Sequence, residues 1–337
     1  MKSSRIYSPA WWLPGGHLQT IWGKLARDRR DLPLTREIWT TPDDDEIEIY
    51  HLAGTEGRPH LLLLHGLEGT VRSHYVNGFF SEASDLGWSA HLLVFRSCGD
   101  HVNKTCRLYH SGETGDVRFA LDRLRPVIGD SQIFLAGVSL GGNVLLKFLG
   151  ESGSALPAGV AAAAAVSVPY DLASSATRIS KGFSRIYQRF FLRTLKLKMI
   201  AKRQRFDDLP SVDVLENIRT LKQFDDVVTA PIHGFQNAMD YYTRSSSLQY
   251  LTSIRLPTLL LSSFDDPFLP PEILAKVELV ARSNPALHVE FLRHGGHVGF
   301  IGGAVPWRPT YYAEHHVMKF FDAYANRAAS TDQGEVA

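Results

Sequence analysis

The chain has 337 residues, of which 44% are hydrophobic and 21% are charged, and its formal net charge is +1. Such a length suits one large core with an inserted segment or two small domains, and the charge gives no general reason to expect nucleic acid as a partner. Cys98 and Cys106 are too few for a disulfide framework, so we expect them to be reduced, although the two could pair. No segment resembles a signal peptide or an apolar run of about 18 residues that would span a membrane.

The first third of the chain predicts the edge and the centre of a β-sheet. It begins with an aromatic N-terminal arm over residues 1–36. Residues 37–40 and 46–50 alternate apolar and polar side chains on either side of a turn, which is typical of an antiparallel hairpin at a sheet edge. Residues 60–64 are too uniformly apolar for a half-exposed strand, so we expect a central parallel strand there. Residues 91–95 are a further strand candidate.

The rest of the chain alternates strands with helices. Residues 114–126 carry apolar side chains at helical spacing, and Pro126 is expected to end that helix. Further strands are predicted at 133–136, 160–168, 258–262 and 288–292, with a closing helix at 310–324. This alternation predicts the α/β class, with a mostly parallel, doubly wound sheet.

Residues 171–250 interrupt the alternation and are rich in helix formers and in Lys and Arg. We interpret them as a helical lid inserted into a core built from residues 37–170 and 251–327, with residues 328–337 as a polar tail. Lids of this kind cover a site and choose its substrates. A basic helical face is most often simply solvated; the sharper hypothesis is peripheral contact with anionic lipid headgroups.

The hexapeptide Gly137–Gly142 contains the pattern G-x-S-x-G between a predicted strand and a predicted helix at residues 143–149. This is the context that a nucleophile elbow requires, and it would expose the Ser139 hydroxyl at a helix N-terminus. Taken alone, such a hexapeptide is often a chance turn. The interpretation of this hexapeptide as a nucleophile elbow depends on the motifs that accompany it.

A serine nucleophile needs a base and an acid that orients the base, and in this fold both follow the serine, acid first. Asp265 and Asp266 follow a predicted strand, and one of them is expected only to cap the next helix. His297 follows two glycines, so its loop can turn back over the serine, whereas His294 is closer to the strand and is expected to be a neighbour. The glycines between the histidines argue against a metal-ligating helix, so we expect no metal ion.

An oxyanion hole requires two backbone N–H donors, one from the residue after the nucleophile, which is Leu140. The second donor is expected in the loop from His65 to Gly69, where Leu67 follows a glycine. His65 and Glu68 of this loop are candidates for the substrate pocket, although His65 could equally be an ordinary structural histidine.

Several stretches together resemble one family. They are residues 13–20, 65–69, 107–114, 137–142, 224–231, 234–235, 241–242 and 265–268. With these residues the chain resembles the YheT-like branch of the α/β-hydrolases, also called the AB hydrolase 4 family, which is related to mammalian lipid hydrolases of the ABHD1 and ABHD3 type. The resemblance extends from Pro14 to about Ala325.

The resemblance implies that Ser139, Asp266 and His297 form the catalytic triad of an esterase or lipid acyl hydrolase that needs no cofactor. This chain departs from the family pattern at one position. Where relatives resemble Arg-Gly-Cys, residues 96–98 read Arg-Ser-Cys, so Ser97 replaces the glycine. A side chain there would narrow the pocket, so Ser97 is a further pocket candidate and the size of the substrate stays open. The membrane anchor of animal relatives is missing here, which favours a cytoplasmic, bacterial protein.

The sequence therefore predicts a serine hydrolase that cleaves small-molecule or lipid carboxylic esters, with short, medium or lipid acyl groups, through an acyl-enzyme. A thioesterase or an amidase would use the same triad and pass through a similar tetrahedral intermediate. A ligand-binding sensor that retains a slow hydrolase site is the alternative from another functional class.

Overall fold

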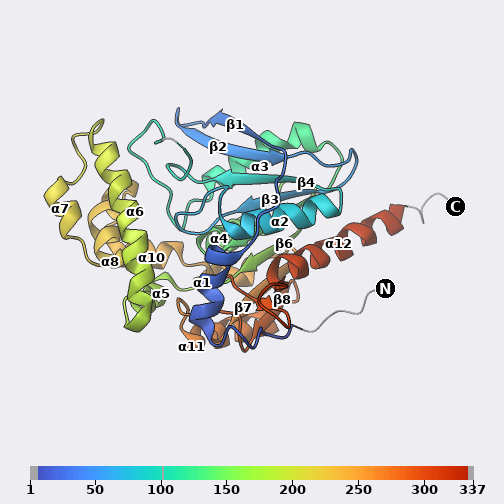
Figure 1. The fold of residues 1–337 in the computed structure, drawn as a ribbon. Helices are drawn as coiled ribbons and strands as arrows, with labels where there is room; N and C mark the ends of the chain where they lie inside the picture. The colour runs from blue at the N-terminus through green and yellow to red at the C-terminus, as the bar shows by residue number, and fades with distance from the viewer. Residues whose placement is uncertain (1–6, 101, 333–337) are drawn as a thin grey trace.

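The computed structural model describes residues 7–100 and 102–332 and contains an eight-stranded sheet with helices on both faces (Figure 1). The strands are Leu34–Thr40 (β1), Glu46–Leu52 (β2), His60–Leu64 (β3), Ser89–Val94 (β4), Ile133–Val138 (β5), Val160–Val166 (β6), Thr258–Ser263 (β7) and Leu287–Leu292 (β8). Their order is β1-β2-β4-β3-β5-β6-β7-β8. The pairs β1–β2 and β2–β4 are antiparallel and all the others are parallel. The predicted α/β class with a mostly parallel, doubly wound sheet is confirmed.

The central strands are buried and largely apolar because helices cover both of their faces. Every residue of β3, β5 and β7 is buried. Helices α2 (His74–Asp85) and α12 (Tyr312–Asp332) contact each other on one face, whereas α3 (Gly115–Ile128) and α4 (Leu140–Ser152) contact each other on the other (Figure 1). Parallel strands end at a common edge, so the segments that follow β3, β5, β7 and β8 are gathered there.

Two helices extend beyond their predicted ends. Helix α3 continues past Pro126 to Ile128, because a proline in the last turn removes only one backbone hydrogen bond. Helix α12 runs to Asp332 instead of ending at 324, through an alanine-containing stretch that favours helix, so it occupies part of the predicted polar tail. Residues 333–337 of that tail lie outside the described residues.

The helices between β6 and β7 are α5 (Leu172–Ile179), η1 (Gly182–Ser184), α6 (Arg185–Arg203), α7 (Val212–Asn217), α8 (Leu221–Phe224), η2 (Asp225–Thr229), α9 (Ala230–His233), α10 (Ala238–Ser245) and η3 (Ser247–Ser253). Those that Figure 1 labels stand together beside one end of the sheet, whereas η3 contacts α4 of the core. Part of this group has a small core of its own, in which Leu195 and Met199 of α6 cluster with Leu215 of α7 and Phe224 of α8. The stretch interpreted as a lid therefore folds as a helical insertion.

The N-terminal arm is fastened to the C-terminal part of the core. Its helix α1 (Gly16–Ala26) carries Gln19, whose Oε1 accepts the Ile301 N–H at 2.7 Å. The Ala10 N–H donates to the Ile301 carbonyl at 2.9 Å. Ile301 belongs to the short strand β9 (Ile301–Gly302), which pairs with β10 (Thr310–Tyr311). The arm thus lies against the segment that follows β8.

Three histidines form a hydrogen-bonded chain across neighbouring strands. His51 on β2 and His91 on β4 approach each other through their Nδ1 atoms at 2.7 Å, and Nε2 of His91 lies 2.9 Å from Nδ1 of His60 on β3. Burial lowers the pKa of all three imidazoles, and for His91 the pKa falls to about 3, with further lowering from the other two rings. The rings are therefore held neutral in the folded protein.

This histidine chain predicts a loss of stability in acid. The unfolded chain takes up a proton on His91 near pH 6.5, whereas the folded protein does not until about pH 3, so the contribution is complete above pH 6.5 and is lost as the pH falls. Between pH 8 and pH 5, wild type should lose about 2 kcal/mol more unfolding free energy than His91→Asn, measured by urea denaturation. His315→Asn, at an exposed position on α12, should lose as much as wild type. Equal losses in wild type and His91→Asn would contradict the prediction.

Candidate active site

Ser139 stands on a sharp turn between β5 and α4. Its backbone angles are φ 54° and ψ −120°, a region that residues with a side chain rarely occupy. The Ser139 N–H donates to the carbonyl of Val166, on the neighbouring strand β6, at 2.8 Å. This bond and the turn hold the serine at the edge where the parallel strands end, as the hexapeptide predicts.

The turn is tight because two of its glycines lie against other backbone. A Cβ atom at Gly141 would lie 2.5 Å from the carbonyl oxygens of Leu64 and His65, at the end of β3. A Cβ atom at Gly137 would lie 2.5 Å from the carbonyl oxygen of Gly141. Any other residue at either position would push α4 away from the strands, and the serine would move with it.

The structure brings Ser139, His297 and Asp266 together in one hydrogen-bonded line. Nε2 of His297 lies 2.9 Å from Oγ of Ser139, and Nδ1 of His297 lies 2.8 Å from Oδ2 of Asp266. An ionised carboxylate only accepts hydrogen bonds, so the proton belongs on Nδ1, and Nε2 is free to accept the serine proton. The Asp266 side chain is fully buried, and its Oδ1 accepts the Phe268 N–H at 2.8 Å, which fixes its orientation.

The neighbouring aspartate has a different task. Oδ1 of Asp265 accepts the N–H groups of Gly295 and Gly296, both at 2.9 Å, and so holds the loop that carries His297. Oδ2 of Asp265 lies 3.2 Å from Nδ1 of His294, which is half exposed. Of the two candidate acids and two candidate histidines, only Asp266 and His297 meet at the serine.

Thr20 of the N-terminal arm also holds the histidine loop, a contact that the sequence reasoning missed. Its Oγ1 accepts the His297 N–H at 2.8 Å. Residues 13–20 contribute to the family resemblance, but the sequence alone assigns no role to Thr20. The task needs the tertiary contact, because the two residues are 277 positions apart.

In the loop after β3, the backbone N–H of Leu67 has no hydrogen-bond acceptor among the described residues, whereas the N–H groups of Gly66 and Glu68 on either side of it are hydrogen-bonded. The Gly66 N–H donates to the hydroxyl of Tyr75, and the Glu68 N–H donates to the hydroxyl of Tyr109, both at 2.9 Å. Among the described residues, none accepts a hydrogen bond from the Leu67 N–H that lies between them. The N–H of Leu140 opens α4 and has no partner within the helix. Leu67, Leu140 and Ser139 line the same cavity.

Glu68 connects this loop to the lid. It has a φ of 57°, and its buried carboxylate accepts hydrogen bonds from the Tyr109 hydroxyl and the Lys198 ammonium, both at 2.7 Å. Lys198 belongs to α6 and was not singled out from the sequence, where it is one of many basic residues. The ion pair between Lys198 of the lid and Glu68 holds Glu68 in place, and Glu68 is the residue that follows Leu67.

The three side chains expected in the pocket lie behind its wall. His65 is fully buried: its Nε2 accepts the Phe95 N–H at 3.0 Å, so its Nδ1 donates to the Gly66 carbonyl, and burial lowers its pKa to about 4. Ser97 turns away to donate to the Asn103 amide oxygen. With Glu68 bound to Lys198, none of the three lines the cavity beside Ser139. His65, Glu68 and Ser97 instead hold the neighbouring loops in place through their hydrogen bonds.

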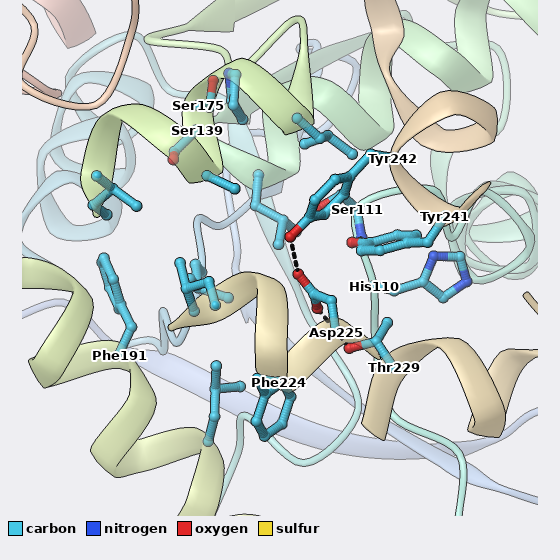
Figure 2. A pocket seen from close by; sticks show the side chains of 18 of the residues that line it. His110, Ser111, Ser139, Ser175, Phe191, Phe224, Asp225, Thr229, Tyr241 and Tyr242 are labelled. Atoms are coloured by element: carbon cyan, nitrogen blue, oxygen red, sulfur yellow. Dashed lines mark hydrogen bonds between the residues drawn. The ribbon is translucent and has the colours of Figure 1, made fainter. Parts of the chain in front are cut away.

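The cavity next to Ser139 has a volume of about 130 Å³ and a largely apolar wall. The core contributes Ser139, His297, Leu67 and Leu140, and the lid contributes residues of α5, α6, α8, η2 and α10. Figure 2 shows Ser139 near Ser175 on one side of the cavity and Asp225, Thr229, Tyr241 and Tyr242 clustered on another. A nucleophile, a base and two free N–H donors beside such a cavity can support acyl transfer.

Within the part of the chain that the structure describes, no group of three or more His, Cys, Asp or Glu residues is arranged to bind a metal ion. No described helix is both long and apolar enough to cross a lipid bilayer. Cys98 is buried and Cys106 is exposed, and both are free thiols.

Comparisons with known proteins agree with this fold. Residues 59–304 match the family described as alpha/beta hydrolase fold. An Escherichia coli protein named "Putative esterase YheT" is 34% identical over 96% of this chain and 95% of its own length. The Homo sapiens phospholipase ABHD3 is 28% identical over 91% of this chain and 76% of its own length. The structure of the Pyrococcus furiosus esterase Pf2001 has a TM-score of 0.54 at 16% identity, over 89% of this chain and 91% of that one, which supports the fold alone.

The backbone of Ser139 generates a prediction about stability. Glycine adopts a positive φ without the strain of about 1–3 kcal/mol that other residues carry there. After allowing for the greater freedom of glycine in the unfolded chain, Ser139→Gly should be more stable than Ser139→Ala by about 1 kcal/mol, measured by urea denaturation.

Ser81, in the middle of α2, is the matched control for this comparison. There Gly should be less stable than Ala by about 1 kcal/mol, because the position is helical. The same order at both positions would contradict the assignment of strain to Ser139.

Proposed function

The chain belongs to the YheT-like branch of the α/β-hydrolase family, and we propose that it hydrolyses carboxylic esters with Ser139 as nucleophile, His297 as base and Asp266 as orienting acid. The observation that carries the proposal is the continuous hydrogen-bonded line from Ser139 Oγ through His297 to the buried carboxylate of Asp266. The relatives named esterase and phospholipase support ester hydrolysis as the reaction.

The proposed reaction follows from where the protons and charges lie. His297 takes the proton of Ser139 as its oxygen attacks the ester carbonyl, and Asp266 stabilises the imidazolium that forms. The Leu67 and Leu140 N–H groups bind the oxyanion of the tetrahedral intermediate. His297 then gives the proton to the leaving alcohol. Water attacks the acyl-enzyme through the same base, which releases the acid and restores the serine.

The wall of the cavity supports a substrate with an apolar part. Leu108 and Ile179, among others, offer hydrocarbon surface, and each methylene group removed from water contributes about 0.8 kcal/mol. We therefore propose short or medium acyl esters, or lipid acyl esters, as the substrate class. No cofactor is needed for this chemistry, because the nucleophile, base and oxyanion donors all come from the chain.

We further propose a cytoplasmic protein whose lid contacts anionic lipid surfaces. Helix α6 contains no acidic residue. It exposes Arg185, Arg189 and Arg193 close to the exposed apolar side chains of Ile186 and Phe190. An amphipathic basic helix of this kind binds anionic headgroups through charge and the interfacial region through its apolar side chains.

The proposed triad predicts distinct losses for two adjacent aspartates. On p-nitrophenyl hexanoate, Asp266→Asn should lower kcat by about 10⁴-fold, because the histidine would lose the partner that fixes its tautomer. Ser139→Ala should lower kcat by about 10⁶-fold. Asp265→Asn should lower it by less than about tenfold, because its amide oxygen still accepts the N–H groups of Gly295 and Gly296. A larger loss in Asp265→Asn than in Asp266→Asn would refute the assignment.

The lid proposal predicts a charge-dependent affinity for membranes. Each arginine near an anionic surface contributes about 1 kcal/mol, so the double variant Arg189→Ser/Arg193→Ser should bind phosphatidylserine-containing vesicles about 30-fold more weakly than wild type in a sedimentation assay. The double variant Arg123→Ser/Lys319→Ser changes exposed cations on α3 and α12 and should retain the wild-type affinity. Equal affinities of all three proteins would show that the basic face is only solvated.

A further inference from the structure

Asp225 is the only carboxylate among the described residues that line the cavity, and the proposed reaction has no use for it. Asp225 lines the cavity on the lid side, together with Phe224 and Thr229. The residue as a whole retains some accessible surface, although desolvation by the surrounding protein raises the pKa of its carboxyl group to about 6. Both properties are expected of an acid that faces an internal cavity instead of bulk solvent.

Asp225 opens a π-helical turn. The helix α8 continues into η2, in which the Ala230 N–H donates to the Asp225 carbonyl, five residues earlier. A π-turn is rare and is found frequently at functional sites. Asp225 and Thr229, at the two ends of this turn, both line the cavity.

Two hydroxyl groups hold the carboxylate without using all of its acceptor positions. Tyr242 donates to Oδ2 at 2.6 Å, and Thr229 donates to Oδ1 at 2.7 Å (Figure 2). A carboxylate offers about four acceptor positions, so about two remain.

Asp225 has no ion-pair partner among the described residues, although the charge of Lys222 lowers its pKa somewhat from a distance. Among the residues that the structure describes, no Lys, Arg or His forms an ion pair with it, and Lys222 pairs with Asp226 at 2.6 Å instead. His110 is also in the cavity wall, but burial lowers its pKa to about 3 and keeps it neutral. An acid held at a cavity wall without an ion-pair partner is stabilised when a ligand donates hydrogen bonds to it.

We propose that Asp225, with Tyr242 and Thr229, forms a specificity subsite that binds a hydroxyl or ammonium group of the substrate at a distance from its ester bond. The inference rests on the proposed esterase function and narrows its substrate class to esters that carry a hydrogen-bond donor remote from the scissile carbonyl. The apolar wall takes the hydrocarbon between the two polar ends. Asp225 determines specificity here and takes no part in bond cleavage.

A purely structural role for Asp225 makes a different prediction. In that case the carboxylate ties η2 to Tyr242 of α10, and replacing it changes stability without changing which ligands bind. Ligand discrimination is therefore the readout that separates the two roles, and it is independent of catalysis.

The test measures binding to the Ser139→Ala protein by isothermal titration calorimetry, with hexan-1-ol, hexane-1,6-diol and 6-aminohexan-1-ol as probes. A hydroxyl buried against an apolar wall weakens binding, so in the absence of the subsite the diol should bind more weakly than the alcohol. With the subsite, the diol should bind at least as tightly as the alcohol. Tighter binding of the amino alcohol than of the diol identifies ammonium as the preferred donor; otherwise the donor is a hydroxyl.

Adding Asp225→Asn to the Ser139→Ala protein should weaken diol binding relative to alcohol binding about tenfold or more, because a charged acceptor is lost. Asp226→Asn is the matched control, since Asp226 is the next residue and does not line the cavity, and the ratio should be preserved. Weaker binding of the diol than of the alcohol to the Ser139→Ala protein overturns the proposal, and this comparison does not need Asp225→Asn to fold. An unchanged ratio in Asp225→Asn overturns it as well.

The failure of this inference is distinguishable from the failure of the proposed function. Binding to a protein without the nucleophile does not depend on hydrolysis. Absence of ester cleavage by wild type would therefore reject the proposed function while the diol and alcohol affinities still report on the subsite.

Discussion

The close approach of α4 to the end of β3 sets the geometry of this edge of the sheet. Only hydrogen fits at the α-carbon of Gly141, because a larger group would meet the carbonyl oxygens of Leu64 and His65. Ser139 turns the chain from β5 into α4 within that space, and it does so with a positive φ. The Leu140 N–H and the loop that begins at His65 are consequently neighbours. A backbone contact thus brings Ser139 and Leu140 beside Leu67, which lies more than 70 positions earlier in the chain.

Buried amide and phenol groups connect this rigid edge to the lid. The Asn143 side chain, on α4, donates to the carbonyls of Ser111 and Ser245 at 2.8 Å and accepts the Ser247 N–H at 2.9 Å. The Tyr241 hydroxyl accepts the Ser111 N–H at 2.9 Å. The elbow helix, the segment at 107–114 and the end of α10 are therefore one bonded unit. The segments 107–114 and 241–242, to which the family resemblance assigned no role, are therefore in contact with each other, and both contribute to the wall of the cavity.

The features that the sequence predicts well are those that depend on local patterns. Uniform apolar runs locate β3 and β6, and the chain order of Ser139, Asp266 and His297 finds three residues that the fold brings together. Side-chain directions in tight loops were not predictable, because Glu68 and Ser97 have positive φ values that turn their side chains out of the cavity wall. Thr20 and Asp225 lie in stretches that the family resemblance marked, at 13–20 and 224–231. Their tasks, like that of Lys198, were not predictable, since these depend on contacts with residues far away in the chain or on the shape of a cavity. Local pattern thus identifies three residues that meet at one site, whereas the residues that support them and the wall of the cavity emerge only in three dimensions.

The hydrogen bond between Thr20 and the His297 N–H has a consequence for biosynthesis. Because the two residues are 277 positions apart, Thr20 leaves the ribosome long before His297 has been made. The elbow around Ser139 belongs to an earlier part of the chain, so during translation it exists without a supported imidazole. The proposed triad therefore cannot be complete until His297 has been translated, and a polypeptide that terminates earlier carries Ser139 without its proposed base.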